Sequence, residues 1–316
     1  MSVWMRRGSG ALGIFLVLAY AIACTPTREL VTKSQTQITG DYLGEQICMS
    51  CHQAESSHWV HTLHARIFRN PRNELEAKSC EACHGPGSRH LVDVNDRSRI
   101  IAFTRQSQTP IMQQNNQCTT CHAGKTHLYW LGSSHQLNDL ACSDCHNPMA
   151  EFSASGLLRT AGVSKTCSSC HRQEFNEFRK RSHMPLIEGK VSCIDCHSPH
   201  GSVTSPLLAG DSVNQVCFKC HAEKRGPFIW EHAPVRDNCL NCHEPHGSNH
   251  DQLLTTARPF LYQQCHTNRG HPNDLLTEAN LGSGTRPDPR ILNRSCQNCH
   301  AQIHGSNHPS GVRFHR

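Results

Sequence analysis

Apolar and aromatic side chains are scarce in this chain of 316 residues. Hydrophobic residues make up 36% and aromatic residues 6%, while glycine and proline contribute 21 and 16 residues. This is poor material for an ordinary hydrophobic core. An apolar run from Ala11 to Ala23 is too short to cross a bilayer core of about 30 Å as a helix. The sequence contains no phosphate loop and no dinucleotide-binding fingerprint, so it offers no support for a nucleotide-dependent enzyme.

Cysteine, in contrast, is abundant, and nearly all of its 20 copies follow one pattern. The motif C-x-x-C-H begins at Cys48, Cys80, Cys118, Cys142, Cys167, Cys193, Cys217, Cys239 and Cys296. A damaged further copy reads Tyr262-Gln-Gln-Cys265-His266.

This motif is the attachment site of c-type haem. Its two thiols add to the vinyl groups on one porphyrin edge, and the histidine that follows places a nitrogen under the iron. The expected haem-binding cysteines are Cys48, Cys51, Cys80, Cys83, Cys118, Cys121, Cys142, Cys145, Cys167, Cys170, Cys193, Cys196, Cys217, Cys220, Cys239, Cys242, Cys265, Cys296 and Cys299. The expected proximal iron ligands are His52, His84, His122, His146, His171, His197, His221, His243, His266 and His300.

Zinc is the alternative for a C-x-x-C pair, but a structural zinc site needs a second pair of ligands. Here a histidine directly follows every pair, and only Cys24 lies outside the intact and damaged motifs, so no thiols remain for a disulfide framework. With about thirty residues for each haem, the haems themselves must form the core. The expected fold is a multihaem cytochrome c that is mostly coil with short helices and little or no sheet.

The motif spacing indicates a repeat. Successive motifs begin 32, 38, 24, 25, 26, 24, 22, 23 and 34 residues apart when Tyr262 is counted as a start. Motifs followed by a Pro-His-Gly turn, at Cys193 and Cys239, alternate with motifs that lack one, at Cys167 and Cys217. The predicted unit is two haems in about fifty residues, and such short units are expected to stack into an elongated array.

Secondary structure is expected to be limited. Apolar spacing predicts helix near Glu55 to Phe68, and a second helix is predicted from Glu174 to Arg181. The stretches Gly85 to Gln117 and Thr267 to Ser295 are predicted to be long surface loops.

The N-terminus indicates export. Arg6 and Arg7 precede the apolar run, so residues 1–23 are predicted to be a secretory signal. Ala21-Ile22-Ala23 is a site for ordinary signal peptidase, while Ala21-Ile22-Ala23-Cys24 resembles a lipobox whose cysteine is acylated. The second interpretation is favoured because Cys24 has no haem role. Residues 24–44 would then be a lipidated tether, and residues 45–316 the decahaem cytochrome domain. Thr25 is not acidic, which favours attachment to the outer membrane on its periplasmic side.

The formal charge of +6 does not indicate a nucleic-acid partner. The signal contributes two positive charges, and ten haems would bring about twenty propionates against about ten ferric porphyrin charges. Basic residues are therefore expected to partner propionates, and no basic run with interleaved aromatics supports nucleic-acid binding.

Fifteen of the 25 histidines lie outside the motifs, enough to give every iron a second imidazole. The predicted distal ligands are His64, His90, His135, His183, His200, His232, His246, His271, His304 and His308, with His58, His61, His127, His250 and His315 in reserve. Iron with two histidines stays six-coordinate, so this set favours electron conduction over catalysis, and no catalytic residue is predicted.

Two positions leave alternatives open. Met149 stands where the comparable turns have His200 and His246, so it is either a thioether ligand that would raise a haem potential or an apolar contact, with a reserve histidine as ligand. Tyr262 removes one thioether partner, so this haem is expected on Cys265 alone, and the alternative is an empty or loosely held site.

These residues resemble a known family. Cys217-Phe-Lys-Cys-His-Ala-Glu-Lys-Arg-Gly-Pro, Trp230-Glu-His-Ala-Pro and the ending His304-Gly-Ser-Asn-His-Pro-Ser-Gly311 are similar to the periplasmic decahaem cytochromes of porin-cytochrome conduits, the MtrA, PioA and DmsE type. The resemblance covers about residues 42–316 and departs from the family at Tyr262 and Met149. It implies a wire of ten haem c groups with iron, held in an outer-membrane β-barrel porin. Its implied partners are periplasmic or inner-membrane cytochromes on one side and an extracellular multihaem cytochrome, acceptor or donor on the other.

Two other functions are weighed against this extracellular electron-transfer conduit. A lipid-tethered periplasmic shuttle, or a subunit that delivers electrons to an extracellular reductase, would need no barrel. A multihaem nitrite- or hydroxylamine-type enzyme would need an open iron, often in a C-x-x-C-K motif, and no such motif occurs.

Overall fold

The computed structural model of the chain describes residues 38–266 and 296–315. By contacts the chain divides into two units, residues 1–37 and residues 38–316. The predicted signal, Cys24, most of the tether, His271 and the loop predicted from Thr267 to Ser295 lie outside the described residues.

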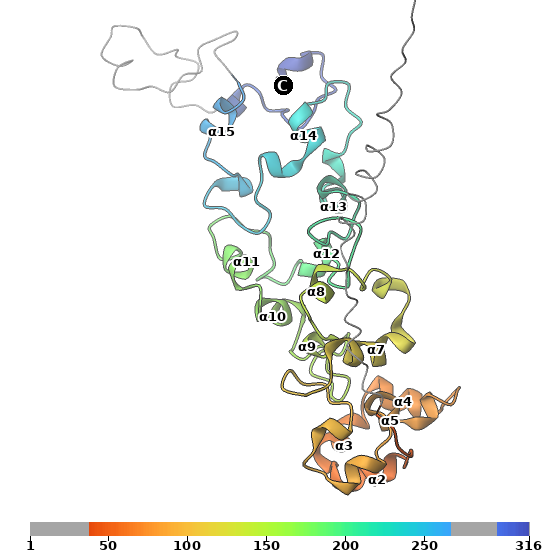
Figure 1. Cartoon of the computed structure of the whole chain (residues 1–316). Helices are drawn as coiled ribbons and strands as arrows, with labels where there is room; N and C mark the ends of the chain where they lie inside the picture. Colours follow the sequence, from red (N-terminus) through yellow and green to blue (C-terminus); the bar gives the residue numbers. More distant parts are fainter. Residues whose placement is uncertain (1–37, 267–295, 316) are drawn as a thin grey trace, which may run out of the picture. The chain divides into compact units, whose positions relative to one another are not determined.

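The described residues form short helices separated by irregular chain (Figure 1). The α-helices are α2 (Glu45–Cys51), α3 (Gln53–Trp59), α4 (Leu63–Phe68), α5 (Cys80–His84), α6 (Ser88–Val92), α7 (Ile111–His122), α8 (Ser134–Leu137), α9 (Cys142–Cys145), α10 (Val163–Ser168), α11 (Arg172–Glu177), α12 (Cys193–Cys196), α13 (Val213–Phe218), α14 (Ala233–Asp237) and α15 (Phe260–Gln263). The 3₁₀ turns are η1 (Glu76–Lys78), η2 (Arg97–Arg99), η3 (Lys125–His127), η4 (Ala222–Lys224), η5 (Cys239–Asn241), η6 (Asp251–Leu253), η7 (Cys296–Asn298) and η8 (Gly311–Arg313).

Extended pairing within these residues is limited to isolated bridges, such as that between Ser182 and Ser248. The prediction of a mostly coil protein with short helices and little or no sheet is therefore confirmed for the described part of the chain.

Two of the predicted elements differ in detail. The helix expected near Glu55 to Phe68 is split into α3 and α4, because the hydroxyl of buried Thr62 accepts a hydrogen bond from Ala65 N and starts a new helix. The loop expected from Gly85 to Gln117 contains α6, η2 and the beginning of α7. The helix expected from Glu174 is present as α11, which begins at Arg172 and ends at Glu177.

Each motif forms one helical turn. The backbone N–H of His52 donates to Cys48 O at 2.9 Å, and the histidines of the other motifs repeat this bond or lie within a helix. Such a turn places residues one, four and five of the motif on one side. The damaged motif keeps the same turn, since His266 N donates to Tyr262 O at 2.9 Å.

An asparagine links two neighbouring motifs. Asn115, on α7 one turn before Cys118, accepts from Cys142 N at 2.8 Å and donates to Leu140 O at 3.0 Å. Asn214, one turn before Cys217, accepts from Cys239 N at 2.8 Å in the same way. The predicted two-haem unit therefore has a physical joint, made by one buried side chain that contacts the first cysteine of the next motif.

The chain after alternate motifs forms a repeated turn. Asn147 N donates to Leu157 O at 2.6 Å, and Ser198 N to Leu207 O at 2.7 Å. Leu157 and Leu207 have φ of 48° and 56°, in the left-handed region that a branched residue seldom adopts. The same turn recurs at Leu253, with φ of 59°.

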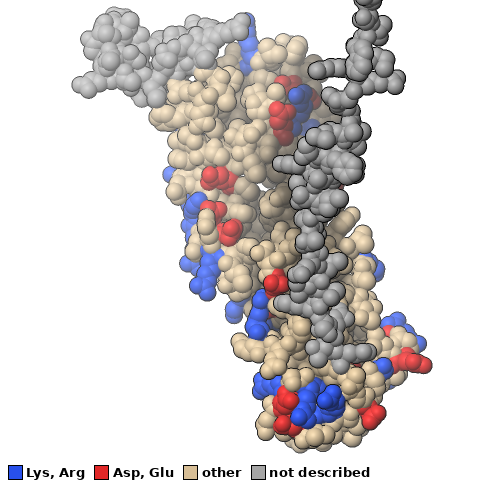
Figure 2. Space-filling view, viewed as in Figure 1, with Lys and Arg blue, Asp and Glu red and all other residues tan. Residues whose placement is uncertain are grey.

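Apolar burial is sparse in this fold. Trp59, Trp130 and Phe178 are buried, but the fully buried side chains among the described residues are those of Thr62 and Ser248. Large apolar groups such as Val92 and Leu131 are exposed by 79% and 81%. Figure 2 shows small groups of charged side chains scattered over a face that is mostly neither acidic nor basic. The protein part alone is therefore too thin to form a continuous core, which agrees with a core built by bound groups.

We predict that Asn115→Ala destabilises the joint between the two motifs. The substitution leaves the part-buried N–H of Cys142 without its acceptor, at a cost of about 1–3 kcal/mol. The thermal unfolding midpoint should fall accordingly. Asn116→Ala is the matched control, because Asn116 is the adjacent, exposed residue of α7 and gains the same helix propensity. Equal midpoints for the two variants would contradict the role of Asn115.

Candidate haem sites

The cysteines of successive motifs lie next to one another, and all of those in the described residues are free thiols. Cys118 and Cys142 share a thiol hydrogen bond, which raises the pKa of Cys118 and lowers that of Cys142. Cys167 and Cys193 form a second such pair, which lowers the pKa of Cys193 to about 7.

Further thiol contacts continue this order along the chain. Burial, and then the neighbouring thiol of Cys121, raise the pKa of Cys83 to about 11. Thiols influence one another's pKa in the same way between Cys48 and Cys80, Cys145 and Cys170, Cys196 and Cys217, Cys217 and Cys239, and Cys242 and Cys265. Each motif therefore lies near enough to the next for their thiols to interact electrostatically, from the first to the damaged one.

Proximal histidines of alternate motifs are oriented by backbone carbonyls. The Nδ1 of His84 lies 2.8 Å from Ile101 O, that of His197 2.9 Å from Pro206 O, and that of His243 2.9 Å from Gln252 O. A carbonyl can only accept, so Nδ1 carries the proton and donates. Nε2 is thereby left as the metal-binding nitrogen, which is the usual arrangement of a ligating histidine.

The intervening motifs have a different partner. The Nδ1 of His52 lies 3.8 Å from a carboxylate oxygen of Glu55, that of His171 3.8 Å from Glu174, and that of His221 3.7 Å from Glu223. The two kinds of motif distinguished in the sequence therefore differ in the group beside Nδ1 of the proximal histidine. It is a backbone carbonyl in one kind, as at His197, and a carboxylate in the other, as at His171.

Histidines outside the motifs face the proximal ones at a common distance. Two imidazoles on opposite sides of one metal ion, with metal–nitrogen bonds of about 2 Å, place their ring centroids about 6 Å apart. Seven pairs have centroids 5.9–6.4 Å apart. They are His52–His90, His122–His64, His171–His135, His146–His200, His197–His246, His266–His232 and His243–His304.

This geometry fits haem. Burial lowers the pKa of His64, His84 and His246, and lowers that of His200 and His304 to about 4, so these rings are neutral as metal ligands must be. The Nδ1 atoms of His64 and His90 are buried with no hydrogen-bond partner among the described residues, as expected of rings that also contact a bound group. These residues would hold the iron, and the paired thiols would hold the porphyrin edge.

Other histidines lie elsewhere. His183 has Nδ1 at 2.7 Å from Lys180 O and Nε2 at 3.1 Å from Glu188 Oε1. The ring of His315 lies 4.5 Å from that of His300, whereas Nδ1 of His308 accepts a hydrogen bond from Ser310 N. His127 lies between two pairs, with its centroid 5.7 Å from His122 and 4.2 Å from His200. His271 lies outside the described residues.

Sequence reasoning missed the groups that orient the ligands. The carbonyls that hold the proximal histidines follow 9 or 10 residues after His146, His197 and His243, each just before a Leu-Leu pair. That pair, repeated after alternate motifs, was an available signal. Asn115 and Asn214, each three residues before a motif, were another.

In the damaged motif, Tyr262 occupies the position of the missing first cysteine. Burial raises the pKa of the Tyr262 phenol, and the nearby thiols of Cys296 and Cys242 raise it further. Cys265 is exposed, and His266 faces His232 at 6.1 Å between centroids. One thioether and two imidazoles are therefore available here.

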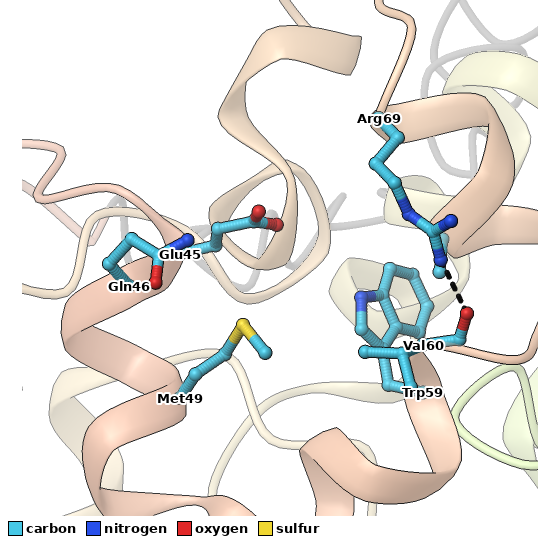
Figure 3. Close-up of a pocket in the computed structure, with 7 residues that line it drawn as sticks. Glu45, Gln46, Met49, Trp59, Val60 and Arg69 are labelled. Carbon is cyan, nitrogen blue, oxygen red and sulfur yellow. Dashed lines mark hydrogen bonds between the residues drawn. The ribbon is translucent and has the colours of Figure 1, made fainter.

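A hollow of about 370 Å³ lies beside the first motif (Figure 3). Met49 of that motif and Trp59 of α3 face each other across it, and Arg69 donates to Val60 O at its rim. Because Met49 lies between Cys48 and Cys51, the hollow belongs to the haem-attachment region. In the described part of the chain, no helix is long and apolar enough to cross a membrane.

The chain is similar to known multihaem cytochromes. Residues 183–226 and 232–271 match the family described as Doubled CXXCH motif, and residues 80–159 match the family described as Cytochrome c-type protein NrfB-like. The chain is 39% identical over 297 residues to the "Multiheme cytochrome MtrA" of Shewanella baltica (strain OS185), which covers 92% of this chain and 88% of that protein. The chain therefore belongs to the MtrA-type multihaem c-type cytochromes, which bind haem c through C-x-x-C-H motifs and transfer electrons.

Proposed function

We propose that this cytochrome conducts electrons across the outer membrane along a row of ten haems held within a β-barrel porin. One observation carries the proposal: thiols of successive motifs lie near one another in chain order, as Cys118 and Cys142 do through a shared hydrogen bond and Cys196 and Cys217 through their electrostatic interaction. Haems bound to adjoining motifs would lie in close succession. A membrane core of about 30 Å is too thick for one electron step, and a large barrel has a lumen that can hold a plug.

The proposed axial set gives a second histidine to nine of the ten proximal histidines, all except His84. Seven proximal histidines would be paired with the histidines that face them, and His183 is proposed as the distal ligand opposite His221. His315 is proposed as the partner of His300 in place of His308, although its ring centroid lies 4.5 Å from that of His300, so the two rings would have to move apart to about 6 Å to hold an iron. Iron with two protein ligands offers no position for substrate, so the protein is proposed to conduct electrons and not to catalyse a reaction.

Membrane attachment is proposed through a lipid on Cys24, which would hold the protein at the periplasmic side of the outer membrane. Electrons would pass between periplasmic or inner-membrane cytochromes and an extracellular cytochrome, acceptor or donor. The name of the 39% identical relative and the resemblance of the motifs support this assembly.

We expect the native protein to copurify with a β-barrel protein from detergent-extracted outer membranes. Cys24→Ser should leave this association intact, because the barrel and not the lipid would hold the cytochrome. Recovery of a free monomer from wild-type membranes, with loss to the soluble periplasm in Cys24→Ser, would favour the lipid-tethered shuttle instead.

The intact mass of the purified protein should equal the chain from Cys24, its lipid and ten haems. Nine haems would mean that the Tyr262 site is empty. A mass that begins at Cys24 without acyl chains would exclude the lipid anchor but leave the haem count intact.

Tyr262→Cys should convert the proposed single-thioether haem into an ordinary one. A haem with one thioether keeps one vinyl group, which shifts its reduced pyridine-haemochrome band to longer wavelength. That shifted component, about one tenth of the total haem, should disappear in Tyr262→Cys with no change in haem count. Tyr42→Cys adds a thiol at an exposed tyrosine outside the motifs and is the control. An unchanged band in Tyr262→Cys would contradict attachment through Cys265 alone.

A further inference from the structure

Neighbouring two-haem units exchange ligands in both directions. His135 precedes the Cys142 motif but faces His171 of the next unit, at 6.1 Å between centroids. In return, His200 follows the Cys193 motif and faces His146 of the preceding unit, at 5.9 Å. At this junction, each unit therefore presents one histidine to a proximal histidine of the other unit.

The last junction repeats the exchange. His232 faces His266 at 6.1 Å and His304 faces His243 at 6.2 Å. The two exchanged residues are also tied together, because Nδ1 of His232 donates to the carbonyl of Ile303, directly before His304. His135 donates in the same way to Pro199 O, directly before His200.

At the junction between the first and second units, a histidine of the first unit faces a proximal histidine of the second. His64 faces His122 at 6.1 Å. Its segment repeats the one that carries His135: a buried tryptophan lies five residues earlier, and a buried hydroxyl two residues earlier caps the following helix in both cases. The return ligand of this junction must then reach His84, the proximal histidine whose Nδ1 is held by Ile101 O.

Met149 occupies the position from which His200, in its own turn, faces a proximal histidine of the preceding unit. Its turn has the hydrogen bonds of the other return turns: Arg159 N donates to Cys145 O at 2.9 Å, as Ala209 N donates to Cys196 O at 2.8 Å. Asn147 N donates across the turn as Ser198 N does. On this backbone Met149 stands where His200 stands.

The residue after Met149 also differs, and in a way that suits a methionine. Gly201 and Gly247 follow the returning histidines, and a Cβ on either would collide with a backbone carbonyl, that of Tyr129 or of Glu177. Ala150 has that Cβ, so its turn cannot approach the facing segment as closely. Consistently, Nδ1 of His64 has no carbonyl partner among the described residues. Methionine has three rotatable bonds and can reach from a turn that stands further away, which a rigid imidazole cannot.

We propose that the Met149 thioether is the distal ligand of the haem attached at Cys80 and Cys83, opposite His84. This rests on the proposed haem set. It differs from ligation of the haem on the motif of Met149 itself, because His146 of that motif already faces His200. With Met149 so assigned, every proximal histidine has one partner, and His271 and His308 are not needed. A thioether ligand raises the potential of its haem, so the second haem of the row would hold an electron more tightly than its neighbours.

The test uses the purified full-length protein with its haems, and each sample is first weighed by intact mass to count them. Oxidised wild type should have one thioether-to-iron charge-transfer band and one haem that reduces at a potential above the rest. Both should vanish in Met149→His, which makes that site bis-histidine, and in Met149→Leu, which keeps the volume without a ligand.

His200→Met identifies which haem is involved. If the residue at this position of the turn ligates a haem of the preceding unit, this variant gives the His146 haem a thioether as well. The band should then double in intensity. The double variant with Met149→His should return it to the wild-type intensity. If Met149 instead ligates the His146 haem, then His200 is not a ligand there and His200→Met leaves the band unchanged.

The outcomes separate this inference from the proposed function. Ten haems by mass with no thioether band in the wild type would overturn the role of Met149 and leave the haem row standing. A peptide mass that shows Cys80 and Cys83 without haem would overturn the haem set itself. A single band that persists in Met149→His would assign it to another methionine and also overturn the proposal.

Discussion

A single helical turn, closed by a hydrogen bond from the histidine N–H to the carbonyl four residues earlier, is the constraint on which the structure depends. Only this turn places two thiols and an imidazole on one side, where they can grip one porphyrin edge and its iron. His52, His197 and His300 all close it at 2.9 Å. Because the turn is so short, it can be repeated every 22 to 38 residues with little other secondary structure.

The rest of the chain serves to join these turns. Within a unit, Asn115 and Asn214 connect one motif to the first cysteine of the next. Between units, imidazoles outside the motifs face the proximal histidines of another motif. Few apolar side chains are buried, so a large share of the cohesion must come from these polar joints and from the haems they surround.

Departures from the repeat are informative because the repeat is so regular. Tyr262 keeps the helical turn of its motif, so the site loses one covalent bond but not its position. Met149 keeps the turn of its neighbours, so the change would fall on the chemistry of the proposed ligand and not on the fold. The paired change to Ala150 agrees with this, since the residue after the ligand sets how closely the turn can approach.

The sequence by itself determined the attachment chemistry and the mostly coil fold, because each motif is a local unit of five residues, and its motif spacing predicts the two-haem period. Tertiary structure decided which histidine faces which. His135 and Pro199 are 64 residues apart, and no local spacing indicates that they meet. Likewise, the helix is divided at Thr62 because the buried hydroxyl of this residue needs a hydrogen-bond partner, which it finds in Ala65 N. Its burial is decided by the tertiary structure. The proposed axial pairing is a long-range property, since each iron would take one ligand from its own motif and the other from wherever the fold brings an imidazole or a thioether.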